Sequence, residues 1–223
     1  TKVSPTDHTV ILDRTAFYPG GGGQPFDKGS IFFKNQKIFV EKVKNKQGEI
    51  IHYLDSSAPL PEFGSQVRGE IDWERRYALM RTHTAMHILC GVIFRDYGAS
   101  VTGGNMEPYK GRMDFEFAGL KKDLITEIEL SINKEVTASR NVSWRILPRE
   151  EAFQIPDLIR TKINLLPPHI QEVRVVEIHG LDLQADGGTH VHNTSEVGQL
   201  EITDYKSKGK DNKRIYLSLT GTS

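Results

Sequence analysis

Two short segments, far apart in the sequence, each place two potential metal ligands four residues apart. The first segment reads His83-Thr84-Ala85-Met86-His87, and the second runs from Asp186 to His190. If the first segment is helical, its two imidazoles share one face. Together with a third imidazole from a loop, they can bind one Zn²⁺ at the usual Zn–N distance of about 2.0–2.1 Å. The spacing therefore predicts a zinc site assembled between a helix and a loop.

The first segment alone is a weak signal, because histidines at this spacing also occur on ordinary buried helix faces. The second segment strengthens the prediction, since Gly187 and Gly188 permit backbone geometry that turns His190 back toward a neighbouring element. Asp186 offers a carboxylate oxygen as a fourth ligand, although it is also a good turn residue that bonds its own backbone. The other candidates for the fourth ligand are Gln184, His179, His192 and water.

Both segments lie next to predicted regular elements. Asp72 is a good N-cap, apolar residues recur at helical spacing after it, and Gly98 offers a C-terminal stop for the helix that carries His83 and His87. Elsewhere in this part of the chain the same reasoning predicts a helix near residues 120–139 and strands near residues 142–147, 173–178 and 215–219. We therefore expect helices packed on an antiparallel sheet.

The N-terminal third of the chain shows a different pattern, in which short strands alternate with turn signals. The predicted strands are residues 10–12, 30–33, 37–40, 50–53 and 67–71. Regularly spaced strands with little helix are typical of a small barrel. The chain is therefore predicted to be α+β, with a small β-barrel-like domain at residues 1–71 and a second domain at residues 72–223.

A run of four glycines, from Gly20 to Gly23, stands between the aromatic pair Phe17 and Tyr18 and the polar residue Gln24. Consecutive glycines can simply form a tight turn or a flexible loop. The aromatic and polar residues on the two sides instead favour a loop that lets backbone approach a ligand or another domain closely.

Composition and charge narrow the class of protein. Lys plus Arg equals Asp plus Glu at 29 each, hydrophobic residues make up 37% of the 223 residues, and no apolar segment approaches the ~18 residues of a membrane span. No secretory signal is visible. The single cysteine, Cys90, cannot form an internal disulfide, and its apolar neighbours suggest a buried, inert thiol. We expect a soluble cytoplasmic protein with no membrane partner.

A formal net charge of zero argues against extensive nucleic-acid coating, because phosphate affinity comes from lysine and arginine. Two local basic clusters are still candidates for RNA contact, although exposed basic turns are usually only solvated. One cluster, near the start of the predicted helix, contains Arg75, Arg76 and Arg81. The other, in a turn near the end of the chain, contains Lys206, Lys208, Lys210, Lys213 and Arg214.

Taken together, these motifs resemble the editing domain of alanyl-tRNA synthetase. The glycine run also matches the glycine-rich motif that precedes this domain in those synthetases and in the longer freestanding AlaX proteins. The family's second motif normally begins with cysteine where this chain has Asp186, so the three histidine positions match and the fourth does not. The matching segments are residues 15–24, 72–76, 83–87, 112–115, 187–191, 194, 196–198, 208–210 and 214–215.

The resemblance implies an enzyme that removes wrong amino acids from tRNA. A pocket sized for alanine cannot strongly reject glycine or serine, because such small differences discriminate by only about 1–3 kcal/mol. A second site that hydrolyses the wrongly charged tRNA supplies the missing discrimination. The chain is therefore expected to deacylate mischarged tRNA(Ala) at its acceptor end, chiefly Ser-tRNA(Ala) and secondly Gly-tRNA(Ala), and to spare Ala-tRNA(Ala). The absence of a P-loop motif and of a recognisable adenylate-forming region implies action in trans.

The same resemblance implies one Zn²⁺ per chain, with His83, His87 and His190 as ligands and Asp186 as the candidate fourth. The ion either lowers the pKa of a bound water or orients the amino or carbonyl group of the substrate. The glycine loop is expected to bring Gln24 to the substrate or to a ligand. Candidates for recognising the serine hydroxyl are the threonines of the matched motifs, Thr15, Thr84 and Thr189.

Two other functions fit parts of the pattern. The histidine motif and the second segment also resemble the editing domain of bacterial-type threonyl-tRNA synthetases, which would change the tRNA and keep the enzyme class. A non-catalytic protein would use the zinc to stabilise an RNA-binding module. The glycine run favours alanine, and the lack of cysteine ligands favours an open, functional metal position. Deacylation assays on both tRNAs, with and without chelator, discriminate among the three.

Overall fold

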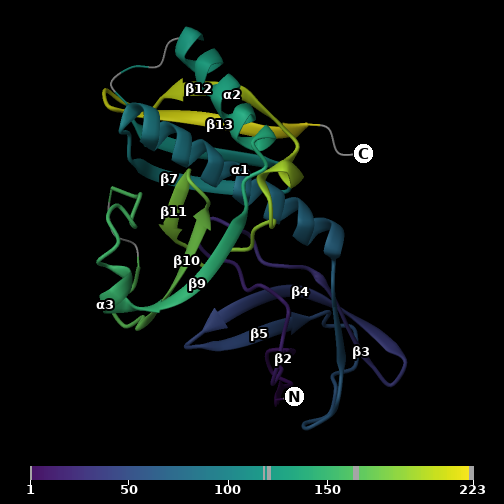
Figure 1. Ribbon diagram of the computed structural model, residues 1–223. Helices are drawn as coiled ribbons and strands as arrows, with labels where there is room; N and C mark the ends of the chain where they lie inside the picture. The colour runs from purple at the N-terminus through teal and green to yellow at the C-terminus, as the bar shows by residue number, and fades with distance from the viewer. Residues whose placement is uncertain (1, 118, 120–121, 163–165, 221–223) are drawn as a thin grey trace. The chain divides into compact units, whose positions relative to one another are not determined.

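A computed structural model of the chain describes residues 2–117, 119, 122–162 and 166–220 (Figure 1). The chain divides into two compact units, Thr1–Tyr77 and Ala78–Ser223, and the division falls inside the long helix α1 (Trp73–Tyr97). In the first unit the regular structure is mostly strand, and the second unit combines helices with two antiparallel sheets. The α+β class predicted from the sequence is confirmed.

The first unit is built on one antiparallel sheet of six strands, in the order β1-β2-β5-β4-β3-β6. This sheet is open and does not form the closed barrel that regular strand spacing suggests. Strand β1 pairs with β2 alone over three residues, and among the described residues no pairing joins it to β6. The bounds are β1 (Lys2–Ser4), β2 (Thr9–Ile11), β3 (Gly29–Phe33), β4 (Gln36–Lys46), β5 (Glu49–Leu54) and β6 (Arg68–Ile71).

The glycine run in the first unit forms a tight turn. Gly20, Gly21, Gly22 and Gly23 have φ angles of 81°, 145°, 57° and 90°, and residues with a side chain rarely adopt such positive values. Gly21 and Gln24 close the turn with backbone hydrogen bonds in both directions, at 3.0 and 2.9 Å. The backbone path of this turn therefore favours glycine at these positions.

Helix α1 begins and ends as the sequence predicts. Asp72 Oδ1 accepts a hydrogen bond from the Arg75 N–H at 3.0 Å, as an N-cap does. Gly98 follows the helix with a φ of 64°, and its N–H donates to the Phe94 carbonyl at 3.0 Å. Between these ends nearly every side chain after Tyr77 is buried as far as Ile93. This part of α1 is therefore a core element of the second unit.

Two antiparallel sheets pack against α1, one in the order β12-β13-β8-β7 and the other in the order β11-β10-β9. The close approach shows at two glycines: a Cβ at Gly111 would meet Met86 at 3.0 Å, and a Cβ at Gly91 would meet Leu181 at 2.9 Å. The bounds are β7 (Val101–Glu107), β8 (Lys110–Glu116), β9 (Val142–Pro148), β10 (Glu172–Ile178), β11 (Asp182–Ala185), β12 (Gln199–Ser207) and β13 (Asn212–Thr220).

Helix α2 (Lys122–Thr137) packs on the four-stranded sheet through a buried apolar side that contains Ile125, Ile128, Ile132 and Val136. Asn133 fastens it to β12, donating to the Leu200 carbonyl at 2.8 Å and accepting from the Leu200 N–H at 3.0 Å. The predicted start of this helix at residues 120–121 lies outside the described residues. Two short helices, α3 (Arg149–Ala152) and η1 (Thr194–Val197), complete the unit. No helix in the described ranges is long and apolar enough to cross a membrane.

Candidate metal centre

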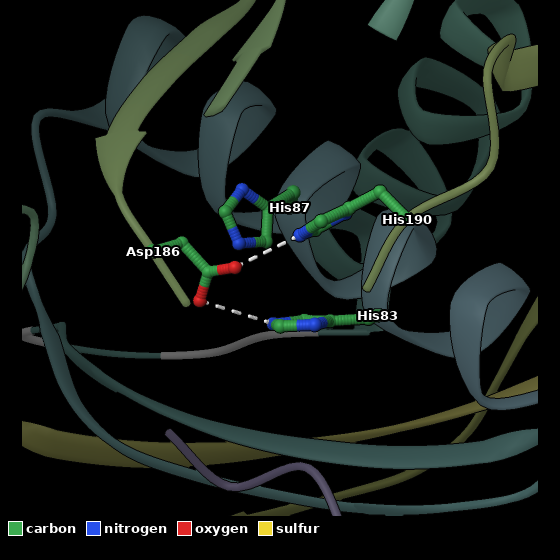
Figure 2. Close-up of side chains that lie close together, drawn as sticks. All are labelled: His83, His87, Asp186 and His190. Carbon is green, nitrogen blue, oxygen red and sulfur yellow. Dashed lines mark hydrogen bonds and ion pairs between the residues drawn. The ribbon is translucent and has the colours of Figure 1, made fainter. Parts of the chain in front are cut away.

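Four side chains of the second unit meet in one cluster (Figure 2). His83 and His87 come from α1, whereas Asp186 and His190 come from the loop after β11. Each offers one potential ligand atom, and these atoms all lie within 4.8 Å of one another. Asp186 Oδ1 is 3.5 Å from His83 Nε2, and Asp186 Oδ2 is 3.0 Å from His190 Nε2. The fold thus brings together the two segments that the sequence predicts to share a metal.

The loop that carries Asp186 and His190 is fixed by hydrogen bonds. The Gly188 N–H donates to Asp186 Oδ2 at 2.7 Å, so this carboxylate also closes the turn. Arg174 of β10 donates from Nη1 to the carbonyl oxygens of Asp186 and Gly188, at 3.0 and 2.8 Å. The two interpretations of Asp186, as ligand and as turn residue, are therefore compatible.

Two of the histidines have a hydrogen-bond partner on the ring nitrogen that faces away from the cluster. His87 Nδ1 lies 2.9 Å from Oδ2 of the buried Asp182. His190 Nδ1 lies 3.2 Å from Thr84 Oγ1, which also accepts from the Val191 N–H at 3.3 Å. With Nδ1 engaged, Nε2 is the atom that each ring can offer to a cation. Metal-binding histidines are commonly oriented in this way.

Burial and charge set the protonation states of the cluster. Burial lowers the pKa of His83 well below its usual value and that of His190 to about 4, so both rings are neutral near pH 7. At His87, burial is outweighed by the hydrogen bond and charge of Asp182, which raise the pKa. At Asp186, burial is outweighed by the neighbouring histidines, which hold its pKa well below the usual range. The carboxylate is therefore ionised, as metal coordination requires.

This donor set fits a zinc ion. Three imidazole nitrogens and one carboxylate oxygen are ligands that Zn²⁺ accepts in its usual four-coordinate arrangement. The histidines are buried and Asp186 is partly buried, so a cation there would be largely shielded from solvent. In the described part of the chain this is the one group of three or more such side chains that is close enough to hold a metal.

The other side chains considered as the fourth ligand lie outside the cluster. The Gln184 amide donates to Asp182 Oδ2 at 2.7 Å and to Cys90 Sγ at 3.3 Å. The side chain of His179 is 82% exposed, and His192 is also exposed. Cys90 is buried, and burial raises the pKa of its thiol well above the usual value, in agreement with the inert thiol predicted.

Comparisons with known proteins decide the family. The model described as "tRNA synthetases class II (A)" matches residues 2–75, and the one described as "Threonyl and Alanyl tRNA synthetase second additional domain" matches residues 173–216. The alanyl-tRNA editing protein AlaX-M of Saccharolobus solfataricus is 42% identical over 94% of this chain and 88% of its own length. The AlaX-M protein of Methanosarcina acetivorans is 38% identical over 96% of this chain and 89% of its own. The chain belongs to the alanyl-tRNA editing proteins.

Membership of this family makes the chain an enzyme of the deacylating hydrolase class. The AlaX-L editing protein of Pyrococcus horikoshii is also similar, at 36% identity over 92% of this chain and half of its own length. The alanine–tRNA ligase of Pyrococcus abyssi is 37% identical over 86% of this chain, which corresponds to 21% of the ligase. The family resemblance predicted from the motifs is confirmed.

The candidate substrate-contact residues of this editing protein divide between the two units. Thr84 is buried in α1 with its hydroxyl at His190, and Thr189 precedes His190 in the loop and is partly buried. Thr15 belongs to the first unit, where its Oγ1 lies 2.8 Å from His52 Nε2. Gln24 is buried in the glycine turn of that same unit.

The predicted basic contacts differ in how exposed they are. Arg81 is buried, and its Nη2 donates to the Val197 carbonyl at 2.7 Å. A buried guanidinium bonded to backbone is not available to phosphate, so Arg81 is removed from the candidates for RNA contact. Three of the remaining candidates for RNA contact bind groups of the protein: Arg76 pairs with Asp27, Arg75 donates to the Phe26 carbonyl, and Arg214 donates to Asp114. The last two candidates, Lys208 and Lys210, are exposed.

Sequence reasoning missed two residues that hold the cluster, Asp182 and Arg174. Both belong to the hairpin of β10 and β11, in which Asp182 pairs with Ile178. The register of such a short hairpin decides which side chains face the cluster, and it cannot be read from either strand alone. The available signal was a single carboxylate between Leu181 and Leu183, because a charged residue in an apolar strand usually has a buried partner.

Changing Asp182 to asparagine should weaken zinc binding by about 10- to 100-fold, the usual effect of losing an outer carboxylate partner. The charge that orients His87 would be lost while the size of the side chain is kept. Competition with a fluorescent chelator measures the affinity, and Glu177→Gln on the neighbouring strand is the matched control. An affinity equal to that of the control would mean that His87 does not bind metal through Nε2.

Changing Asp186 to cysteine should raise zinc affinity, because a thiolate is a softer ligand than a carboxylate and binds Zn²⁺ more tightly. The variant Asp186→Asn separates ligation from the turn, since its amide oxygen can still accept from the Gly188 N–H. We expect chelator competition to rank the affinities as cysteine above aspartate above asparagine. Three equal affinities would restrict Asp186 to the turn.

Proposed function

We propose that this editing protein hydrolyses the ester bond of mischarged tRNA(Ala), chiefly Ser-tRNA(Ala) and secondly Gly-tRNA(Ala), and spares Ala-tRNA(Ala). The observation that carries the proposal is the cluster of three histidines and one carboxylate in a chain whose relatives are alanyl-tRNA editing proteins. These relatives are matched over nearly their whole length, which supports action in trans on the acceptor end of a charged tRNA.

We also propose that the cluster holds one Zn²⁺ through His83, His87, His190 and Asp186. When bound there, zinc supplies Lewis-acid chemistry, either polarising a carbonyl oxygen or making water more acidic. Neutral His83 and His190 and the ionised Asp186 support this assignment, because they are already in the forms that coordinate a cation.

The surrounding residues supply orientation and charge. Asp182 fixes the His87 ring, and Thr84 fixes the His190 ring, so neither must reorganise during the reaction. The guanidinium of Arg174 lies 3.8 Å from Asp186 Oδ2. A fixed cation beside the reacting ester favours the negative charge that develops on the carbonyl oxygen when water attacks.

A panel of charged tRNAs tests the proposed substrate. Ser-tRNA(Ala) should be hydrolysed fastest and Gly-tRNA(Ala) more slowly. Ala-tRNA(Ala) and Ser-tRNA(Thr) should lose their amino acids only at the spontaneous rate. Faster hydrolysis of Ser-tRNA(Thr) than of Ser-tRNA(Ala) would show that the protein edits tRNA(Thr) instead. We further propose a cytoplasmic location, where charged tRNA is used. Cell fractionation tests this, and recovery of the protein in an exported or membrane fraction would contradict it.

Changing Gln24 to alanine should reduce hydrolysis of Ser-tRNA(Ala) without a large loss of thermal stability. The reason is that its amide can donate to and accept from a substrate. The hydrogen bonds between Gly21 and Gln24 that close the glycine turn are made by backbone and are kept in the variant. The measurements are kcat/KM and the melting temperature, with Gln36→Ala at an exposed position of the same unit as the control. A large drop in melting temperature with normal activity per folded molecule would make Gln24 a structural residue.

A further inference from the structure

An exposed apolar strip, consisting of Trp144 and Ile146, lies on β9 at the edge of the three-stranded sheet. The two side chains are 60% and 53% exposed, which is notable for residues of this size. Alternate residues of a strand point to the same side of the sheet, so the two share one face. Strand β9 pairs with β10 alone in the described sheet, and the strip therefore borders solvent.

The strip lies on the face of the sheet that carries the metal centre. Val176 of β10 pairs with Trp144 on one side and with Gln184 on the other, so these three side chains lie in a row. Gln184 donates to Asp182, which in turn bonds His87. Neighbouring strands are about 4.8 Å apart, so the Trp144 backbone stands about 10 Å from that of Gln184.

Arg174 connects the strip to the cluster. It pairs with Ile146 across β10 and β9. Its guanidinium lies 5.2 Å from the centre of the Trp144 ring and its Nη1 lies 3.8 Å from Asp186 Oδ2. One side chain thus reaches both groups, and the exposed indole lies next to the place where the ester would be cleaved.

We propose that Trp144 is the stacking platform for the terminal nucleobase of the substrate tRNA, with the positive charge of Arg174 beside it. The inference rests on the proposed function. In an aminoacyl-tRNA the amino acid is esterified to the ribose of the terminal nucleotide, so the terminal base is one sugar away from the reacting bond. With the ester at the cluster, that base must rest on the adjoining surface. Aromatic side chains are the usual platform for unpaired bases of RNA.

The size and charge of the strip favour a base over a protein partner. A stable protein interface buries about 800 Å² per partner, far more than two side chains can provide. The charge beside the indole is a cation, because the Arg174 guanidinium lies over the Trp144 ring. A positive charge there attracts a phosphate-bearing ligand electrostatically, without giving up the bonds that hold Arg174 in place.

A similar pair on the other side of the sheet offers a matched control. The Arg149 guanidinium lies 4.7 Å from the centre of the Phe153 ring, and Phe153 is 39% exposed. Phe153 directly follows α3, whose Ala152 packs with Val173 and Val175 on the opposite face of the sheet. Loss of this aromatic ring removes an exposed cation–π pair without touching the face that carries the cluster.

The test compares Trp144→Ala, Trp144→Phe and Phe153→Ala in hydrolysis of Ser-tRNA(Ala). Loss of one stacked base usually weakens binding about tenfold or more, so Trp144→Ala should raise KM by at least that factor with unchanged zinc content. Trp144→Phe should recover most of the affinity, and Phe153→Ala should behave as wild type. In parallel, the Trp73→Phe protein leaves Trp144 as its one tryptophan, whose fluorescence reports stacking directly.

The fluorescence probe is uncharged tRNA(Ala) with a complete CCA end, compared with the same tRNA lacking the terminal adenosine. The complete tRNA should quench Trp144 and the truncated one should not. If Trp144→Ala has the same KM as Phe153→Ala, or if both tRNAs quench the Trp144 fluorescence equally, Trp144 does not stack on the terminal base. If the wild-type protein hydrolyses no charged tRNA, the proposed function fails, and the comparison of the two tRNAs still decides whether Trp144 binds a terminal base.

Discussion

Replacing His83 and His190 together with alanine should abolish stoichiometric zinc binding and slow the release of serine from Ser-tRNA(Ala) by on the order of a hundredfold or more. The two changes remove one helical and one loop member of the proposed ligand set, and the two that are left, His87 and Asp186, are too few to hold zinc tightly. Lewis-acid chemistry contributes several kcal/mol to ester cleavage, which corresponds to a loss of this size.

Elemental analysis and initial rates of deacylation measure the two effects of the double variant. His179→Ala is the matched control, because His179 is an exposed histidine of the same unit outside the cluster. It should keep both zinc and activity. Stoichiometric zinc that persists in the double variant would show that the metal is held elsewhere in the chain.

The largest effect on specificity should come from removing a single hydroxyl group. Wild-type protein should cleave Ser-tRNA(Ala) and leave Ala-tRNA(Ala) intact. The reason is that a buried polar group that hydrogen-bonds the serine hydroxyl is left without a partner when alanine binds. A site built around such a hydrogen bond can discriminate by about 10⁴-fold, far more than a missing methyl allows. Valine substitution of Thr15, Thr84 or Thr189 keeps the shape and removes the hydroxyl.

The substitution at the true recognition residue should bring cleavage of Ala-tRNA(Ala) close to that of Ser-tRNA(Ala), and the other two should keep the wild-type ratio. Thr84 needs a second measurement, because its hydroxyl also bonds His190 and accepts from Val191. Thr84→Val should therefore lower zinc affinity as well. Three variants with the wild-type ratio would exclude these threonines from recognition of the serine hydroxyl.

The ligands of the candidate centre could be predicted because their signals are local. Four-residue spacing on a helix places His83 and His87 on one face whatever surrounds the helix, and Asp72 and Gly98 set its ends by backbone chemistry alone. The glycines before His190 likewise indicate a turn. These features depend on residues within a few positions of one another, and the structure agrees with each of them.

The residues that escaped prediction depend on pairings between distant segments. Asp182 reaches His87 across 95 positions of sequence, and Trp144 joins the face of the centre through the register of β9 with β10. The inward position of Arg81 has the same origin, since its partner is the carbonyl of Val197 in another part of the unit. Helical spacing places an arginine on a face, but the identity of the buried face is set by the sheets that pack on α1.

The most direct test of the account is the initial rate of serine release from Ser-tRNA(Ala) by wild-type protein, before zinc removal, after it, and after zinc is restored. Zinc-loaded protein should release serine rapidly and leave Ala-tRNA(Ala) at its spontaneous rate, chelated protein should lose nearly all of that activity, and one Zn²⁺ per chain should restore it. Serine release at the spontaneous rate by zinc-loaded protein, or full activity in protein shown by elemental analysis to be metal-free, would contradict the account.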